Sequence, residues 1–222
     1  MSGSAHSDGF RILRRQLNRE RVLAARDRAL RLALEMGWLD PEAPVALGRP
    51  RPGFTLERPD DPDYVRFLQR LYQDPVFEAL RSDPGLQQAF DGLGAGAFRH
   101  IPADVCRVVP PAASPTPPHQ DSHYLGRYPH FWIAWLPLGD CTRAMGPIAV
   151  ARASHLAGVQ PHARDPLGRD VVTGAQRLDW ICTDLECGDL ILFHNHAIHK
   201  ALPNRSDRIR LSVDFRFGVR AP

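Results

Sequence analysis

The stretch "FWIAWLPLGD" (131–140) decides the fold class, because it is a short aromatic and β-branched run that ends at a Gly-Asp turn. Runs of this kind, bounded by Gly, Pro, Asn and Asp, are typical of β-strands. The second half of the chain contains six more: "DVCRVVPP" (104–111), "GPIAVARAS" (146–154), "WICTDL" (180–185), "DLILFH" (189–194), "KALPN" (200–204) and "IRLSVDFRFGV" (209–219). Together they predict a many-stranded sandwich or barrel.

The first part of the chain has a different pattern, with apolar residues at helical spacing. They recur every three to four positions from about Phe10 to Trp38 and again over residues 61–90. Asp74-Pro75 and Asp83-Pro84 each look like an N-cap followed by proline at the first helical position. The chain is therefore expected to be one mainly β domain in three parts: a disordered N-terminus at 1–9, a helical flank at 10–92 and a β core at 93–220.

Composition excludes several classes of protein. The chain has 222 residues, 28 basic and 25 acidic, and a net charge of +3. This near balance, without a basic stripe or zinc-finger spacing, argues against a nucleic-acid partner. Four cysteines without a CxxC pair predict a reduced, intracellular protein. No signal peptide or membrane-length apolar run is evident, so we expect a cytoplasmic protein that does not bind membranes.

The segment "PPHQDSHY" (117–124) places His119, Asp121 and His123 at alternate positions, as metal ligands on one face of a strand would lie. On a strand, neighbouring members of this set are about 6.6 Å apart, and the two histidines about 13 Å apart. All three cannot then bind one ion, because imidazole nitrogen binds metal at about 2.1 Å. One adjacent pair is expected to bind, either His119 with Asp121 or Asp121 with His123.

The third ligand must come from a distant strand, and "LILFHNHAIHKALPN" (190–204) supplies three candidate histidines: His194, His196 and His199. Two histidines and one carboxylate on one face of an ion leave three positions open, as in non-haem Fe(II) oxygenases. The same donor set also binds zinc, so a zinc hydrolase and a non-catalytic metal-binding jelly-roll protein remain alternatives.

These segments resemble the phytanoyl-CoA dioxygenase family of Fe(II)/2-oxoglutarate oxygenases. "HQDSHY" (119–124) is similar to the family's HQD-x-HY segment, "AWLPLGD" (134–140) to its Ala/Val-Trp strand, and "MGPIAVARASH" (145–155) to its NG-L-x-V-x-PGSH turn. "GDLILFHNHAIHKALPNRSDRIRLSVDFRF" (188–217) resembles the distal histidine segment. The resemblance covers a little under half of the chain, in the family's order. It implies a double-stranded β-helix, or jelly roll, flanked by N-terminal helices.

Carried over by position, the resemblance implies that His119, Asp121 and His199 bind Fe(II). The family's 2-oxoglutarate-binding arginine follows the distal histidine by eleven residues, which gives Arg210. A guanidinium suits this role because it binds a carboxylate through two hydrogen bonds. The resemblance also places Gln120 and Trp135 beside the cosubstrate. Weaker expectations are substrate contacts from three further residues: His123, Arg107 and Arg143.

The implied reaction uses Fe(II), 2-oxoglutarate and O₂ to hydroxylate a small molecule, with release of succinate and CO₂. Asp121 favours hydroxylation, since halogenating relatives have Gly or Ala at this position. Two departures from the family pattern are Ala201, where members often have Ser or Thr, and Ala153, which replaces a glycine of the PGSH turn. Desaturation, cyclisation and epimerisation at the same iron remain alternative outcomes. Specialised bacterial metabolism is the expected setting.

Overall fold

The computed structural model describes residues 5–56, 60–94, 98–125, 128 and 130–219. The helices are α1 (Ala5–Asp8), α2 (Arg19–Glu35), α3 (Pro62–Tyr72), α4 (Pro75–Arg81) and α5 (Pro84–Asp91), with short 3₁₀ turns η1 (Val45–Leu47), η2 (Asp121–His123), η3 (Arg143–Met145), η4 (Ser154–Ala157) and η5 (Ala175–Arg177). The strands are β1 (Phe10–Leu13), β2 (Phe98–Val109), β3 (Phe131–Pro137), β4 (Ile148–Ala151), β5 (His162–Arg164), β6 (Asp170–Val172), β7 (Trp180–Ile181), β8 (Leu190–His194), β9 (His199–Ala201) and β10 (Arg210–Val219).

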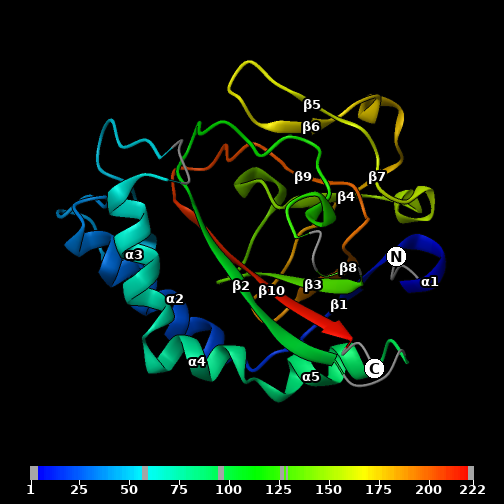
Figure 1. The fold of residues 1–222 in the computed structure, drawn as a ribbon. Helices are drawn as coiled ribbons and strands as arrows, with labels where there is room; N and C mark the ends of the chain where they lie inside the picture. The colour runs from blue at the N-terminus through cyan, green and yellow to red at the C-terminus, as the bar shows by residue number, and fades with distance from the viewer. Residues whose placement is uncertain (1–4, 57–59, 95–97, 126–127, 129, 220–222) are drawn as a thin grey trace.

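Two antiparallel sheets form a jelly roll. The major sheet has the order β1-β8-β3-β10-β2, the minor sheet the order β7-β4-β9, and β5 and β6 form a separate hairpin. Figure 1 shows α2 to α5 on one side of β2 and β10, with β4, β7, β9 and the β5–β6 hairpin on the other. The expected jelly roll with flanking helices is confirmed.

The strand period of two divides the major sheet into an outer and an inner face. On β3, Phe131, Ile133 and Trp135 pack between the sheets, while Ala134 and Leu136 belong to the core under the helices. On β10 the outer face is likewise apolar, with Leu211, Val213, Phe215 and Phe217 under the helices. The inner face of β10 is polar and buried: Arg210, Ser212, Asp214 and Arg216. A polar row inside the jelly roll marks the site.

The predicted helix starts in the flank agree with the structure. Asp74 and Asp83 are N-caps whose carboxylates accept backbone N–H groups at the first turns of α4 and α5, and proline follows each. Such caps contribute about 1 kcal/mol each. All seven runs that predicted strands contain or overlap one.

Three expectations of local structure are wrong. The helical flank at 10–92 contains strand β1, which pairs with β8 in the major sheet. The disorder expected at 1–9 is contradicted by α1 at Ala5–Asp8, whereas residues 1–4 lie outside the described residues. The segment from His119 to His123 is not a strand, since Asp121 begins the 3₁₀ turn η2. Strand spacing therefore does not apply beyond His119.

Candidate metal centre and cosubstrate pocket

The structure brings the three predicted ligands together at the edge of the minor sheet. His119 and His199 face each other across an isolated antiparallel bridge, with N–O distances of 2.9 and 3.0 Å. Asp121 follows at the start of η2. One ligand atom from each of the three lies within 4.8 Å of the others, and all three side chains are buried. Among the described residues this is the only such group of three metal-binding side chains.

Both histidines are held in the form that binds metal. His119 Nδ1 lies 2.9 Å from the carbonyl of Pro117, and His199 Nδ1 lies 3.1 Å from the carbonyl of Ala197. Because a carbonyl only accepts, Nδ1 must carry the proton, which leaves the Nε2 lone pair facing the centre. Burial lowers the pKa of His119 to about 3 and also lowers the pKa of His199, so both rings are neutral at neutral pH. Two neutral imidazoles and a carboxylate suit Fe(II).

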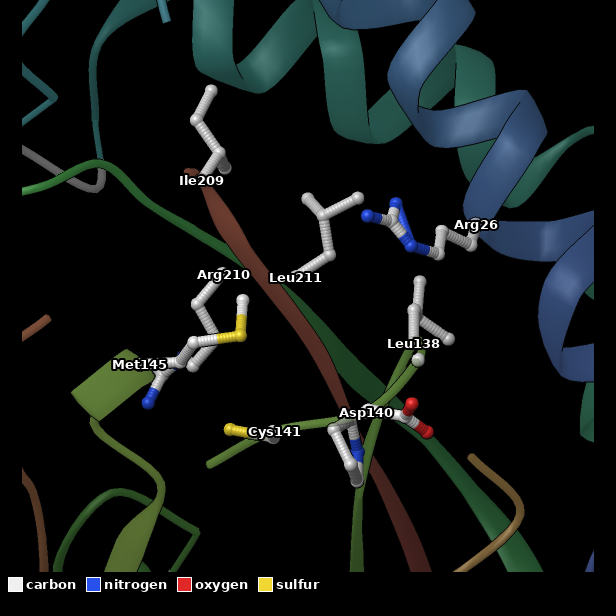
Figure 2. Close-up of a pocket in the computed structure, with 10 residues that line it drawn as sticks. Arg26, Leu138, Asp140, Cys141, Met145, Ile209, Arg210 and Leu211 are labelled. Carbon is white, nitrogen blue, oxygen red and sulfur yellow. The ribbon is translucent and has the colours of Figure 1, made fainter. Parts of the chain in front are cut away.

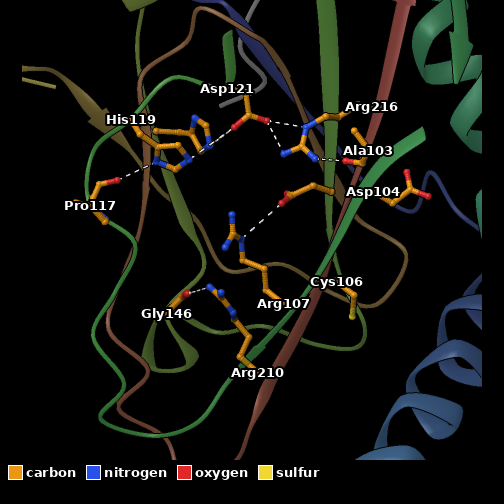
Figure 3. Close-up of polar contacts among 12 residues, drawn as sticks. Ala103, Asp104, Cys106, Arg107, Pro117, His119, Asp121, Gly146, Arg210 and Arg216 are labelled. Carbon is orange, nitrogen blue, oxygen red and sulfur yellow. Dashed lines mark hydrogen bonds and ion pairs between the residues drawn. The ribbon is translucent and has the colours of Figure 1, made fainter. Parts of the chain in front are cut away.

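Asp121 presents only one of its oxygens to the histidines (Figure 3). Its Oδ1 lies 3.6 Å from His119 Nε2 and 3.7 Å from His199 Nε2. Its Oδ2 accepts from Arg216, at 2.9 Å from Nε and 2.7 Å from Nη2. Burial alone would raise the pKa of Asp121, but the Arg216 guanidinium holds it well below its usual range. The carboxylate is therefore ionised and ready to bind a cation.

A pocket beside the ligands has the features of a keto-acid site. It is lined by Arg107, Thr116, His119, Trp135, Ile148, His199, Ala201, Arg210 and Asp214. Arg210 is buried, donates through Nη1 to the carbonyl of Gly146, and has its guanidinium carbon 5.8 Å from the Trp135 ring centroid. Arg210 Nε and the hydroxyl of Ser212 are buried without a hydrogen-bond partner among the described residues. Two unsatisfied donors on neighbouring inner positions of β10 fit a carboxylate.

Arg210 also borders a second hollow, lined by residues from both faces of the major sheet (Figure 2). Figure 2 shows Arg26 from α2 reaching toward this space, with Cys141 and Met145 on the opposite side. Arg26 donates to the carbonyl of Ala46 at 3.2 Å. None of the three predicted metal ligands lines this hollow, whereas His119 and His199 line the first pocket.

The predicted cosubstrate contact of Gln120 stays a prediction, and the structure shows other partners for its side chain. Its side chain is fully buried, and its amide forms hydrogen bonds with the backbone of other segments. Nε2 donates to the carbonyls of Gly158 (2.9 Å) and His196 (2.6 Å), and Oε1 accepts from the N–H of Gln160 (2.7 Å). Gln120 therefore ties the loop before β5 to the segment before His199, and it does not line the pocket.

The predicted substrate contact of Arg143 also stays a prediction. Arg143 is exposed, donates through Nη2 to the carbonyl of Cys182 at 3.1 Å, and does not line the pocket. His123 lies beside the site without joining the triad: its ring stacks on His162 of β5 at 4.1 Å, and its Nε2 is 3.5 Å from Asp170. Trp135 and Arg107 line the pocket as expected. Their contacts with bound molecules stay predictions.

The sequence interpretation missed Ser212 and Arg216. The signal was present, because residues 210, 212, 214 and 216 share one face of a strand and are all polar, whereas the residues between them are apolar. Once Arg210 is placed inside the jelly roll, the strand period puts Ser212 and Arg216 inside with it.

Comparison with known proteins agrees with this geometry. The sequence profile described as "Phytanoyl-CoA dioxygenase (PhyH)" matches residues 5–212. The chain belongs to the phytanoyl-CoA dioxygenase family. It is an enzyme of the class of 2-oxoglutarate-dependent non-haem iron oxygenases, as the resemblance predicted.

The chain is similar to two bacterial hydroxylases and to several non-heme oxygenases of known structure. The chain is 29% identical to the 1-deoxypentalenic acid 11-beta-hydroxylase of Streptomyces arenae, over 94% of this chain and 76% of that protein. The corresponding enzyme of Streptomyces exfoliatus is 27% identical over the same shares. Among solved structures, the apo form of the non-heme monooxygenase ThoJ superposes with a TM-score of 0.68 (20% identity, 97% of this chain, 75% of that chain). EvdO2 from Micromonospora carbonacea, complexed with 2-oxoglutarate, gives 0.62 (20% identity, 100% and 96%).

None of the helices in the described part of the chain is long and apolar enough to cross a bilayer.

Proposed function

We propose that this oxygenase hydroxylates an unactivated C–H bond of a small molecule in bacterial specialised metabolism. The observation that carries the proposal is the buried group of His119, Asp121 and His199 beside a pocket that contains Arg210. Fe(II) bound there, together with 2-oxoglutarate and O₂, supplies the oxidation: one oxygen atom enters the substrate, the other enters succinate, and CO₂ is released. The hydroxylase relatives of Streptomyces support this outcome.

The protein's own residues bind and orient. His119 and His199 offer Nε2, and Asp121 offers Oδ1, to Fe(II) on one side, which leaves the other side for the cosubstrate and O₂. We assign Arg210 to the distal carboxylate of 2-oxoglutarate, because it lines the pocket and its Nε is buried without a partner among the described residues. Trp135 closes the pocket next to the guanidinium and excludes water, which strengthens these charge-assisted bonds.

Arg107 is the residue we assign to an anionic group of the substrate. It lies on the inner face of β2, opposite Ser212, and lines the pocket with both histidine ligands. Its side chain is 34% exposed, and its ion pair with Asp214 is long, at 3.7 Å. A guanidinium so placed has donors to spare for a carboxylate. The substrate of the Streptomyces relatives is itself an acid by name.

Two measurements test the proposed function. Anaerobic addition of 2-oxoglutarate to the Fe(II)-loaded enzyme should give a visible charge-transfer band, and His199→Ala should abolish it. Candidate acids are then screened for substrate-dependent succinate release, with ¹⁸O₂ used to trace oxygen into the product. Absence of the band refutes the oxygenase assignment and leaves a structural metal site. Succinate without labelled product indicates desaturation, cyclisation or epimerisation instead.

The role of Arg107 has its own test. Arg107→Met should raise KM for the acid substrate by roughly tenfold or more, as expected for a lost charge-assisted hydrogen bond of about 1.5–3 kcal/mol. The affinity for 2-oxoglutarate, read from the charge-transfer band, should change less than threefold. The reverse pattern would assign Arg107 to the cosubstrate.

A further inference from the structure

We propose that Arg216 is a positioning residue that makes Asp121 a one-oxygen metal ligand. The inference rests on the proposed metal centre and deepens it. Arg216 lies in β10, six positions beyond Arg210, and outside the residues that the family profile matches. Both side chains are buried, with exposed fractions of 7% for Arg216 and 5% for Asp121. Nε and Nη2 of Arg216 both contact the same oxygen of Asp121, Oδ2.

The separation of the two carboxylate oxygens is the central observation. Oδ1 is nearly equidistant from the Nε2 atoms of His119 and His199, at 3.6 and 3.7 Å, where a shared ion would bind. Oδ2 accepts a charge-assisted hydrogen bond from Nε of Arg216 and forms an ion-pair contact with Nη2 of the same guanidinium. Charge-assisted bonds are about twice as strong as neutral ones, so rotating Oδ2 toward a metal would cost both.

A distortion in the neighbouring strand holds Arg216 in place. In the pairing of β10 with β2, Asp214 faces Val105 but Arg216 faces Ile101. Three residues of β2 (102–104) therefore lie opposite one residue of β10, which is a β-bulge. The bulge turns the carbonyl of Ala103 inward, where it accepts from Arg216 Nη1 (Figure 3). The guanidinium is thus bonded on two sides.

The same bulge directs its other polar residue away from the site. The carboxylate of Asp104 binds Arg81 Nε at 2.7 Å and His100 Nε2 at 2.6 Å. Asp104 is thereby kept off Arg216, which is left to Asp121. Bulges next to active sites commonly redirect side chains in this way.

Control of the second oxygen matters because the reaction needs free coordination positions. A carboxylate can bind a metal through one oxygen or through both. Three protein ligands that each bind through one atom would leave three positions for the cosubstrate and O₂. If Asp121 bound through both oxygens, one of these positions would be lost. Arg216 prevents this by occupying Oδ2.

Charge repulsion between Arg216 and the metal predicts the opposite effect on metal affinity from a positioning role, so a binding measurement distinguishes the two. Arg216 is a cation close to where another cation binds, and removing it would tighten metal binding if repulsion were its main effect. If Arg216 positions Asp121, removing it weakens binding, and losing a partner of a metal ligand typically costs 10- to 100-fold in affinity.

The test uses Co(II) alone, titrated calorimetrically into the full-length protein. We expect the Kd of Arg216→Met to be roughly 10- to 100-fold weaker than wild type. The visible spectrum of bound Co(II) should also change, as the coordination of Asp121 changes. Arg216→Lys keeps the charge but loses the paired N–H donors of the guanidinium, so we expect its Co(II) affinity to be at least threefold weaker than wild type. This variant replaces Arg216→Met in the test if Arg216→Met does not fold. Arg28→Met is the matched control, because it breaks an Arg–Asp pair between helices, with Asp74 at 2.5 Å.

A second background tests whether Arg216 acts through Asp121. In Asp121→Gly, adding Arg216→Met should change the Co(II) Kd less than twofold, because the group that Arg216 positions is gone. The proposal is overturned by unchanged or tighter Co(II) binding in a folded Arg216 variant. It is also overturned if Arg216→Met weakens Co(II) binding in the Asp121→Gly background as much as it does in the wild type. Co(II) binding needs no turnover, so a wild-type enzyme without a 2-oxoglutarate band would refute the proposed function and leave this result intact.

Discussion

Arg210→Lys should weaken 2-oxoglutarate binding by an amount that the structure bounds. Arg210 Nη1 is already used by the carbonyl of Gly146, while Nε is buried without a protein partner. A carboxylate on this guanidinium can therefore form two charge-assisted bonds, one of them to Nε. Lysine offers a single nitrogen and loses at least one such bond, worth about 1.5–3 kcal/mol. The corresponding increase in Kd is roughly 10- to 150-fold.

The assay is an anaerobic titration of the Fe(II)-loaded variant with 2-oxoglutarate, followed through the charge-transfer band. Co(II) affinity without cosubstrate should stay within twofold of wild type, because Arg210 does not contact the triad. Arg26→Lys, in the hollow of Figure 2, is the matched control for a partly buried arginine that hydrogen-bonds a carbonyl. A folded Arg210→Lys enzyme with 2-oxoglutarate affinity within twofold of wild type would refute the reasoning.

Four further predictions concern single side chains. Ala201 lines the cosubstrate pocket, so Ala201→Ser should tighten 2-oxoglutarate binding roughly 2- to 10-fold in the same titration, the value of one neutral hydrogen bond. Phe215 is fully buried, and Phe215→Ala should lower the free energy of unfolding in urea by about 3–5 kcal/mol, whereas Leu167→Ala, 62% exposed, should change it by less than about 0.5 kcal/mol. Ala153 has φ 57°, so Ala153→Gly should raise that free energy by about 0.5–1 kcal/mol, the relief of left-handed strain less the entropy of glycine. Burial lowers the pKa of His194 to about 4, below the unfolded value of about 6.5. The stability that neutral His194 contributes above pH 6.5 is therefore lost as pH falls toward 4. In His194→Gln, the urea concentration at the unfolding midpoint should depend less on pH across that range.

Strands within apolar runs bounded by turn residues could be predicted from the sequence, whereas β1, β5 and β6 could not. β3, β8 and β10 each contain an apolar or alternating run long enough to be recognised. β1 has only four residues, and the helical spacing that predicts α2 continues across them. Its strand conformation comes from pairing with β8 and from burial of Phe10 and Ile12 between the sheets. That is a tertiary effect, which local periodicity does not contain.

Some residues of the candidate site could likewise be predicted from the sequence, whereas the contacts of others could not. His199 and Arg210 were predicted from the family resemblance, and both line the same pocket in the structure. The contacts of Gln120 could not be predicted, because its partners come from residues 158–160 and from His196, which only the folded chain brings together. The alternation from His119 to His123 suggested a strand, but the chain turns at Asp121. This turn is what sends His123 toward the β5–β6 hairpin instead of the metal.

The helical flank has a role in the site, and β10 shows why. The outer side chains of β10 pack against the helices: Phe215 lies 5.6 Å from Phe77, and Phe217 lies 4.2 Å from Phe90, measured between ring centroids. Alternate inner side chains of the same strand are Arg210 and Arg216, whose burial costs free energy unless they are paired. Apolar burial on the outer face, at roughly 1.5–3 kcal/mol for a large side chain, offsets that cost on the same ten residues. Because β10 is also hydrogen-bonded on both edges, to β2 and β3, its inner side chains have little freedom to move. The helices therefore stabilise the strand that holds Arg210 and Arg216.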